Sequence, residues 1–284
     1  MNAKQNEDYI IEADELCFAY EEGGPNSLNG MNLKITRGEK VAFMGANGSG
    51  KSTFFLCCNG IHKPNAGKLS FNGVPVSYSK NELLKLRSKV GIVFQDPDNQ
   101  LFSASVFQEI SFGILNLCVP ADQARQAVEQ VIADLEITPF RERPAHALSG
   151  GEKKQVSIAD IVVMNPEVII LDEPAASLDP KHTRMVNQII NELAGKGITI
   201  LIATHDINYA LDWADRIVLM QDGKVLAQGD PVTICSDKEL LTSTNLEEPA
   251  VLKMFYSLCH KGILPKTLKP PLNMKELERY IEEN

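Results

Sequence analysis

A glycine-rich stretch in the N-terminal part of the chain has the residue types and spacing of a phosphate-binding loop. Residues 45–53 read Gly-Ala-Asn-Gly-Ser-Gly-Lys-Ser-Thr, which fits a glycine, four variable residues and then Gly-Lys-Ser. Glycines let the backbone turn tightly and bring N–H groups close to anionic oxygens. We expect Lys51 to reach the β- and γ-phosphates of a nucleotide and the Ser52 hydroxyl to bind Mg²⁺. The other expected nucleotide contacts in this loop are Gly45, Ala46, Asn47, Gly48, Ser49, Gly50 and Thr53.

The alternative is a glycine-rich turn that matches this pattern by chance. The flanking residues count against it, because residues 40–44 form an apolar, strand-like run and residues 54–58 continue as an apolar helix. Strand, loop and helix in this order are the setting that the motif needs. We therefore interpret the loop as a nucleotide site.

A second candidate site follows an all-apolar strand at residues 168–171, which ends in Asp172 and Glu173. A buried strand of this kind delivers carboxylates to the edge of an open α/β sheet where ligands bind. Asp172 would hold Mg²⁺, mostly through water, and Glu173 would orient or deprotonate an attacking water. The alternative is a strand that ends in solvated acids, and the phosphate loop upstream makes that interpretation the weaker one.

A third candidate is the start of a predicted helix, where residues 148–152 read Leu-Ser-Gly-Gly-Glu. Ser149, Gly150 and Gly151 could form a second anion site, because N–H groups at a helix start point outward. A plain helix cap is the alternative, and this stretch by itself favours the cap.

This stretch lies after the phosphate loop and just before the strand that ends in Asp172. Leu-Ser-Gly-Gly-Glu at this place resembles the signature motif of ABC-type ATPases. Other positions match that family in sequence order. Gln95 resembles the Q-loop glutamine, which touches Mg²⁺ and senses the partner subunit, and Asp179 lies in a stretch that resembles the D-loop. His205 resembles the switch histidine, which contacts the γ-phosphate, and Tyr20 resembles the aromatic residue that stacks on adenine.

The resemblance covers about residues 9–245 and implies ATP and Mg²⁺ as cofactors. It implies an α/β fold, with a P-loop NTPase core of mostly parallel sheet, an N-terminal antiparallel β subdomain and a helical subdomain at about residues 95–165. Residues 246–284 are expected to form a C-terminal helical dimerisation module. The implied metal ligands are Ser52, Gln95 and Asp172, and the implied catalytic residues are Lys51, Gln95, Glu173 and His205.

In that family two ATPase domains meet head to tail, so each ATP lies between one phosphate loop and the partner's signature motif. This chain has one of each. Ser149, Gly150 and Gly151, together with Asp179, are therefore expected to act on a nucleotide held by a second subunit. That subunit is either a second copy or a paralogue, and the sequence leaves both open.

Residues 93–102, Val-Phe-Gln-Asp-Pro-Asp-Asn-Gln-Leu-Phe, resemble more narrowly the energy-coupling-factor ATPases, which drive uptake of vitamins and of cobalt or nickel ions. In that group an extra short helix after the Q-loop meets a transmembrane energy-coupling subunit, which works with a substrate-binding membrane subunit. Residues 248–252 and 273–277 resemble the group's C-terminal module, which helps dimerisation. The expected apolar face of this module comprises Val251, Leu252, Phe255 and Leu258. The alternative is that this face packs on its own domain.

Three positions depart from the family pattern. Glu152 stands where glutamine is common, Gln155 where many members carry a basic residue, and Asp160 where glycine or alanine is usual. Glutamate and glutamine are both long polar residues, so we expect little effect at Glu152. The other two departures put the fine packing of the signature helix in doubt, and not the activity.

Composition limits the other functions. With 28 basic and 37 acidic residues among 284, the net charge is −9, which argues against nucleic acid as a partner. No apolar stretch is long enough to span a bilayer. Residues 1–8 are polar and contain no apolar core, so we expect no signal peptide. We expect a peripheral protein on the cytoplasmic face of a prokaryotic cell membrane. Another ABC importer class, and a soluble ABC ATPase acting on ribosomes or DNA, are the alternatives.

The periodicity predicts strands and helices that alternate after residue 40. Predicted strands cover residues 9–20, 28–35, 40–44, 68–71, 90–94, 168–171, 198–203, 217–220 and 225–228. Predicted helices cover residues 81–88, 105–115, 121–135, 152–164, 180–193 and 207–213, besides the one that begins near Lys51.

Overall fold

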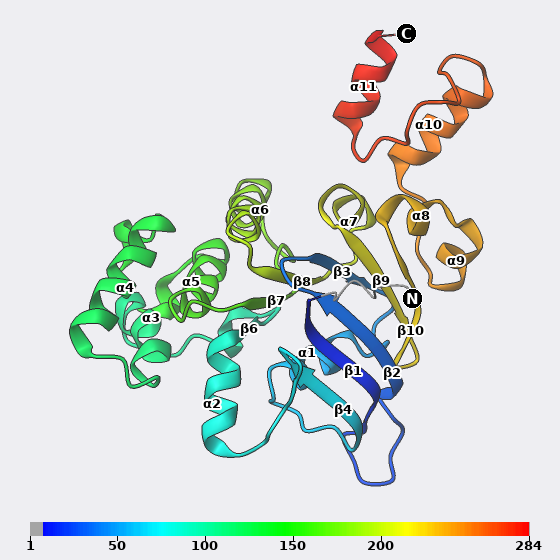
Figure 1. Cartoon of the computed structure of the whole chain (residues 1–284). Coiled ribbons are helices and arrows are strands. Elements are labelled where there is room, and N and C mark those ends of the chain that lie inside the picture. Colours follow the sequence, from blue (N-terminus) through cyan, green and yellow to red (C-terminus); the bar gives the residue numbers. More distant parts are fainter. Residues whose placement is uncertain (1–7, 284) are drawn as a thin grey trace.

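The computed structural model describes residues 8–283, which form two sheets with helices around them (Figure 1). The smaller sheet is antiparallel, in the order β2-β1-β4-β5. Its strands are β1 (Tyr9–Phe18), β2 (Leu28–Thr36), β4 (Ala66–Phe71) and β5 (Val74–Pro75). The expectation of no signal peptide rests mainly on residues 1–7, which lie outside the described residues. No helix within residues 8–283 has the length and apolar character needed to cross a membrane.

The larger sheet has the order β10-β9-β3-β8-β7-β6 and is mostly parallel. Its strands are β3 (Lys40–Met44), β6 (Val90–Val93), β7 (Val168–Asp172), β8 (Thr199–Ala203), β9 (Arg216–Gln221) and β10 (Lys224–Gly229). β10 pairs antiparallel to β9, and the remaining ladders are parallel. Strands β6, β7 and β8 are almost wholly buried, which explains why they are apolar throughout rather than alternating.

The helices cover the larger sheet and extend beyond it. They are α1 (Lys51–Cys58), α2 (Lys80–Lys89), α3 (Val106–Leu115), α4 (Ala121–Asp134), α5 (Gly150–Val162), α6 (Pro180–Gly195), α7 (Ile207–Trp213), α8 (Pro231–Ser236), α9 (Lys238–Ser243), α10 (Ala250–His260) and α11 (Met274–Glu283). Three 3₁₀ helices are η1 (Pro97–Asn99), η2 (Thr138–Phe140) and η3 (Ala145–Ala147). Helices α3, α4 and α5 gather beside β6 and β7 at one end of the larger sheet (Figure 1). The predicted fold class is confirmed.

Most predicted elements are found within one or two residues of their expected ends. The first strand stops at Phe18, before Tyr20, and the expected short helix after Gln95 is a single 3₁₀ turn, η1. Helices α8 and α9 were not predicted individually. Asp230 caps α8 through the Thr233 N–H, and a proline opens the helix, so an Asp-Pro start signal was present in the sequence.

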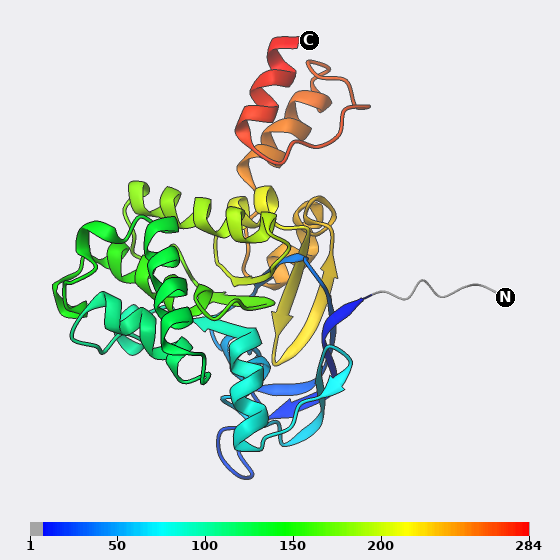
Figure 2. The ribbon, with the colours of Figure 1, turned by 60° about the vertical axis from the view of Figure 1, so that its left-hand side comes forward.

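Helices α10 and α11 project away from the rest of the chain in both views (Figures 1 and 2). The apolar face expected on α10 does not lie open for a partner. Val251, Leu252 and Phe255 are buried, and they pack in one cluster with Leu277 of α11. This apolar face is covered within the chain, because α11 and the segment before it return along α10. That residues 246–284 serve in dimerisation stays a prediction.

Candidate nucleotide site

The phosphate loop connects β3 to α1, and its backbone needs glycine at two positions. Gly45 has φ +138°, and a Cβ atom there would lie 2.2 Å from the Met220 carbonyl oxygen. Gly50 has φ +104°, and a Cβ atom there would lie 2.7 Å from the Ser27 carbonyl oxygen. No side chain caps the N-terminus of α1, so its first N–H groups face the loop without a side-chain acceptor. This arrangement suits an anion.

Lys51 is buried at the first turn of α1 and points its amine back over the loop. Its Nζ donates to the carbonyl oxygens of Gly45 at 2.7 Å and Ala46 at 3.1 Å. Burial lowers the pKa of Lys51, and the carboxylates of Glu173 and Asp172 oppose that shift. The cation therefore lies where phosphate oxygens bound in the loop would meet it.

A hydroxyl and a carboxylate meet beside the loop. Ser52 Oγ donates to Asp172 Oδ2 at 2.6 Å, although the two residues come from α1 and the end of β7. Gln95 lines the same cavity and adds an amide oxygen. Hydroxyl, carboxylate and amide oxygens are the ligands that Mg²⁺ takes, so these three residues fit the ion.

Glu173 and His205 face each other across the cavity. His205 Nε2 lies 3.3 Å from Glu173 Oε1. Glu173 adopts φ +46°, and its N–H donates to the Ala203 carbonyl oxygen at 3.0 Å. Burial raises the pKa of Glu173; Asp172 adds to the rise, while His205 and Lys51 oppose it. A carboxylate with a raised pKa is a stronger base than an ordinary glutamate.

These residues line one cavity of about 300 Å³. It is lined by Tyr20, Ser27, Asn47, Gly48, Ser49, Gly50, Lys51, Ser52, Thr53, Gln95, Asp172, Glu173 and His205. Gly45 and Ala46 lie just behind it and contribute carbonyl oxygens to Lys51. Ser27 was not predicted. It lies in the turn before β2, and no local sequence signal marks it.

Tyr20 lines the cavity and is 60% exposed as a residue. Its hydroxyl lies 3.1 Å from Thr53 Oγ1, and its ring packs edge-on against Phe18 and His62. The Phe18 and His62 rings stack on each other, with centroids 4.6 Å apart. Sequence reasoning missed both supporting rings, because they come from separate segments.

The signature residues lie outside this cavity. Ser149 caps α5 and Glu152 completes a capping box, with the Ser149 N–H donating to Glu152 Oε2 at 2.7 Å. Glu152 is long enough to complete this cap, so we expect glutamate in place of the common glutamine to have little effect here. Ser149 and Gly150 are exposed and Gly151 is buried. Asp179 is also exposed, at the start of α6, where it accepts hydrogen bonds from two backbone N–H groups.

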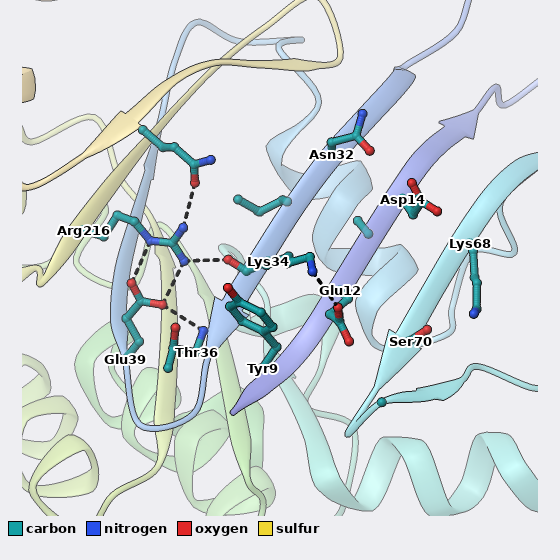
Figure 3. Close-up of a pocket in the computed structure, with 14 residues that line it drawn as sticks. Tyr9, Glu12, Asp14, Asn32, Lys34, Thr36, Glu39, Lys68, Ser70 and Arg216 are labelled. Atoms are coloured by element: carbon teal, nitrogen blue, oxygen red, sulfur yellow. Dashed lines mark hydrogen bonds and ion pairs between the residues drawn. The ribbon is translucent and has the colours of Figure 1, made fainter. Parts of the chain in front are cut away.

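A larger cavity of about 810 Å³ contains none of the predicted site residues (Figure 3). It lies against β1, β2 and β4. Arg216 at its edge donates to both carboxylate oxygens of Glu39, to Gln228 Oε1 and to the Lys34 carbonyl oxygen (Figure 3). These bonds join the two sheets, so the arginine is occupied structurally and is not free to bind a phosphate.

The comparisons with known proteins agree with the geometry of the smaller cavity. The family model described as ABC transporter matches residues 28–176, a span that includes the phosphate loop, Gln95, the signature residues and Glu173. The chain belongs to the ABC transporter family.

Two relatives and two solved structures identify more narrowly the type of ABC protein that this chain resembles. It is 44% identical over 246 residues to an energy-coupling factor transporter ATP-binding protein of Clostridium perfringens, covering 86% of each chain. It is 43% identical over 276 residues to a protein described in the same words from Methanospirillum hungatei, covering 97% of this chain and 69% of that one. The ABC protein is thus an ATPase of the energy-coupling factor type.

Among solved structures, cbiO1 of Clostridium perfringens matches with a TM-score of 0.74 and 43% identity, covering 88% of this chain and 100% of that one. It is described as part of the ABC transporter complex cbiONQ. A dimeric ATP-binding cassette bound to ADP and Pi matches with a TM-score of 0.71 and 27% identity, covering 78% of this chain and 99% of that one. Both likenesses agree with the predicted fold.

Proposed function

We propose that this ATPase powers an energy-coupling-factor importer as half of a head-to-tail dimer on the cytoplasmic face of a prokaryotic membrane. One observation carries the proposal. The phosphate loop, Gln95, Asp172, Glu173 and His205 line a single cavity, whereas Ser149, Gly150 and Asp179 are exposed elsewhere on the same chain. The exposed groups are therefore available to a nucleotide that a second subunit presents. The dimeric cassette bound to ADP and Pi supports this arrangement by similarity.

In this proposal the cavity holds ATP with Mg²⁺. The loop N–H groups and the start of α1 bind the phosphates, and Lys51 meets the β- and γ-phosphate oxygens. Ser52, Gln95 and Asp172 hold Mg²⁺, which neutralises phosphate charge when bound. Tyr20 offers its open ring face to the adenine base.

Glu173 accepts a proton from the water that attacks the γ-phosphorus, and the bond to the β-phosphate oxygen breaks to leave ADP and phosphate. Its raised pKa suits it to that proton transfer. His205 lies close enough to Glu173 to orient its carboxylate. In this proposal His205 also donates a hydrogen bond to a γ-phosphate oxygen. Lys51 stabilises the negative charge on the phosphate oxygens.

The membrane partner is proposed to dock beside the Q-loop segment, which we define as residues 94–103. Phe102 is 68% exposed, and Phe112 and Leu115 are 51% exposed. The Phe102 and Phe112 rings pack edge-on with centroids 5.1 Å apart. Large apolar side chains that cluster on a surface mark protein-interaction sites. A helix of a transmembrane subunit would cover them and receive the movement of Gln95.

The transported solute is proposed to be a cobalt or nickel ion or a vitamin, delivered through a substrate-binding membrane subunit. The cbiONQ complex to which a similar structure belongs is consistent with this class. An ATPase of another ABC importer class is the second candidate. Recovery of a substrate-binding lipoprotein system in a pull-down from the source membranes would favour that candidate.

The direct test of the proposed hydrolysis is Glu173→Gln. We expect ATP binding to persist, turnover to fall about 10²-fold or more, and a closed dimer to accumulate with ATP. Glu82→Gln is the matched control, because Glu82 is an exposed residue of α2 that pairs with Lys85. It should leave turnover unchanged. Near-normal turnover of Glu173→Gln would remove Glu173 from this role.

A further inference from the structure

The helix that begins with the signature motif is tied to the Q-loop segment through a buried lysine. Lys154 of α5 is only 1% exposed. Its Nζ donates to the carbonyl oxygens of Phe94 and Gln95, at 2.8 Å each. Those two residues directly follow β6, which ends at Val93. The amine therefore holds the backbone at the point where the chain leaves the sheet.

Other side chains on the same face of α5 contact the same segment. Lys153 Nζ lies 2.6 Å from Asp98 Oδ1. Gln100 Nε2 donates to the Ser157 carbonyl oxygen at 2.9 Å and to Asp160 Oδ2 at 3.3 Å. Positions three and four apart share a helix face, so these contacts form one continuous strip along α5.

Burial of the charged Lys154 amine is unfavourable unless hydrogen bonds replace its contacts with water. Burial lowers the pKa of Lys154 to about 8, and the carboxylates of Asp172 and Asp96 oppose that shift. An aliphatic side chain of similar length would fill the space without the desolvation of a charged group. The amine instead donates hydrogen bonds to two backbone carbonyl oxygens of the Q-loop segment.

We propose that Lys154 is a positioning residue that makes the signature helix and the Q-loop backbone move as one unit. Through it, a displacement of Gln95 at this subunit's ATP is passed to Ser149 and Gly150, which face the partner's ATP. The inference rests on the proposed function, because it assumes that the signature residues act on the nucleotide of a second subunit. It adds a link within one subunit between the two nucleotide sites of the dimer.

The test compares Lys154→Met with Lys85→Met. Methionine keeps an unbranched chain of similar length and removes the donor, so the two Q-loop carbonyls lose their side-chain partner. Lys85 is the matched control, because it is an exposed lysine of α2 whose amine pairs with Glu82 of the same helix. The measurements are affinity for a fluorescent ATP analogue, kcat and KM for ATP, and the ATP-induced dimer fraction in a Glu173→Gln background.

For Lys154→Met we expect unchanged affinity for the analogue, a kcat lowered roughly tenfold or more, and a smaller dimer fraction. The reason is that displacing a positioned catalytic group by about 1 Å lowers the rate even though the group is still present. Lys85→Met should stay within about twofold of the unmodified protein in all three measurements, since exposed ion pairs such as Lys85–Glu82 contribute little. Lys154→Arg, which restores donors, should regain part of the lost kcat.

An unchanged kcat and dimer fraction in Lys154→Met would overturn the proposal. Loss of analogue affinity in parallel with kcat would overturn it as well, because a general loss of structure moves both. If Lys154→Met unfolds, Lys154→Gln replaces it, since glutamine keeps an N–H₂ donor on a shorter chain and should show an intermediate kcat. Normal turnover of Glu173→Gln would contradict the proposed function separately, whatever the lysine variants do.

Discussion

Ser52 Oγ lies 2.6 Å from Asp172 Oδ2, across 120 positions of sequence. The contact joins the first turn of α1 to the carboxyl end of β7. It brings two oxygen ligands together where the phosphate loop opens. Ser52 and Asp172 would therefore help to hold Mg²⁺, which would supply positive charge for the phosphate oxygens.

Ser52→Ala should therefore separate nucleotide binding from its dependence on Mg²⁺. We expect ATP affinity without Mg²⁺ to stay nearly unchanged, and the gain in affinity on adding Mg²⁺ to be lost, with turnover down about 10²-fold. Titration of a fluorescent ATP analogue with and without Mg²⁺ measures this. Ser52→Thr keeps the hydroxyl and is the control. A full Mg²⁺ response in Ser52→Ala would exclude Ser52 as a ligand.

Replacement by alanine should change the free energy of unfolding differently at the two signature glycines. A Cβ atom on Gly151 would lie 2.1 Å from His182 Cδ2, whereas a Cβ atom on Gly150 would meet nothing within 4 Å. Gly151→Ala should lower the free energy of unfolding by about 1–3 kcal/mol, because the α6 side chain must shift. Gly150→Ala should leave it unchanged or slightly raised. Thermal or urea unfolding compares them, and equal stabilities would contradict this packing.

Much of the nucleotide cavity could be predicted from sequence, because its chemistry is carried by short motifs at the ends of apolar strands. The loop, Glu173 and His205 follow buried parallel strands, and Asp172 is the last residue of one of them. Parallel strands end at one edge of the sheet. Most element bounds were predictable for the same reason, since the period of apolar residues changes where an element ends.

What could not be predicted depends on contacts between distant segments. The apolar face of α10 was visible as a pattern, but the pattern does not say that Leu277 covers it. Lys154 carries no local sequence signal that predicts its position, and only the fold places its amine beside two carbonyl oxygens of the Q-loop segment. His62 beside Tyr20 is a further case.

Tyr20 is expected to bind adenine through its ring and not through its hydroxyl. Tyr20→Ala should raise KM for ATP about twofold to tenfold with little change in kcat, because aromatic pairs contribute about 0.5–1.5 kcal/mol beyond their buried area. Tyr20→Phe should retain a KM close to that of the unmodified protein, since it loses only the contact with Thr53 Oγ1. Steady-state kinetics of both variants checks this. A larger effect of Tyr20→Phe on KM than of Tyr20→Ala would assign the interaction to the hydroxyl.

Asp160 predicts a pH-dependent stability. Burial raises the pKa of Asp160 well above its ordinary value, and the Glu109 carboxylate adds to the rise. The folded state therefore binds a proton that the unfolded state releases above about pH 4. Protonated Asp160 therefore contributes its full stabilisation below about pH 4. This contribution is lost as the pH rises through the folded-state pKa of Asp160.

Asp160→Asn should remove this penalty, because an amide stays neutral and its N–H₂ can donate to Gln100 Oε1, a buried oxygen for which no hydrogen bond is found among the described residues. At neutral pH we expect the variant to be more stable by on the order of 1 kcal/mol or more, and the gain should shrink towards pH 4. Urea unfolding at a series of pH values measures the difference. A gain that is constant across that range would mean that Asp160 is charged in the folded protein throughout.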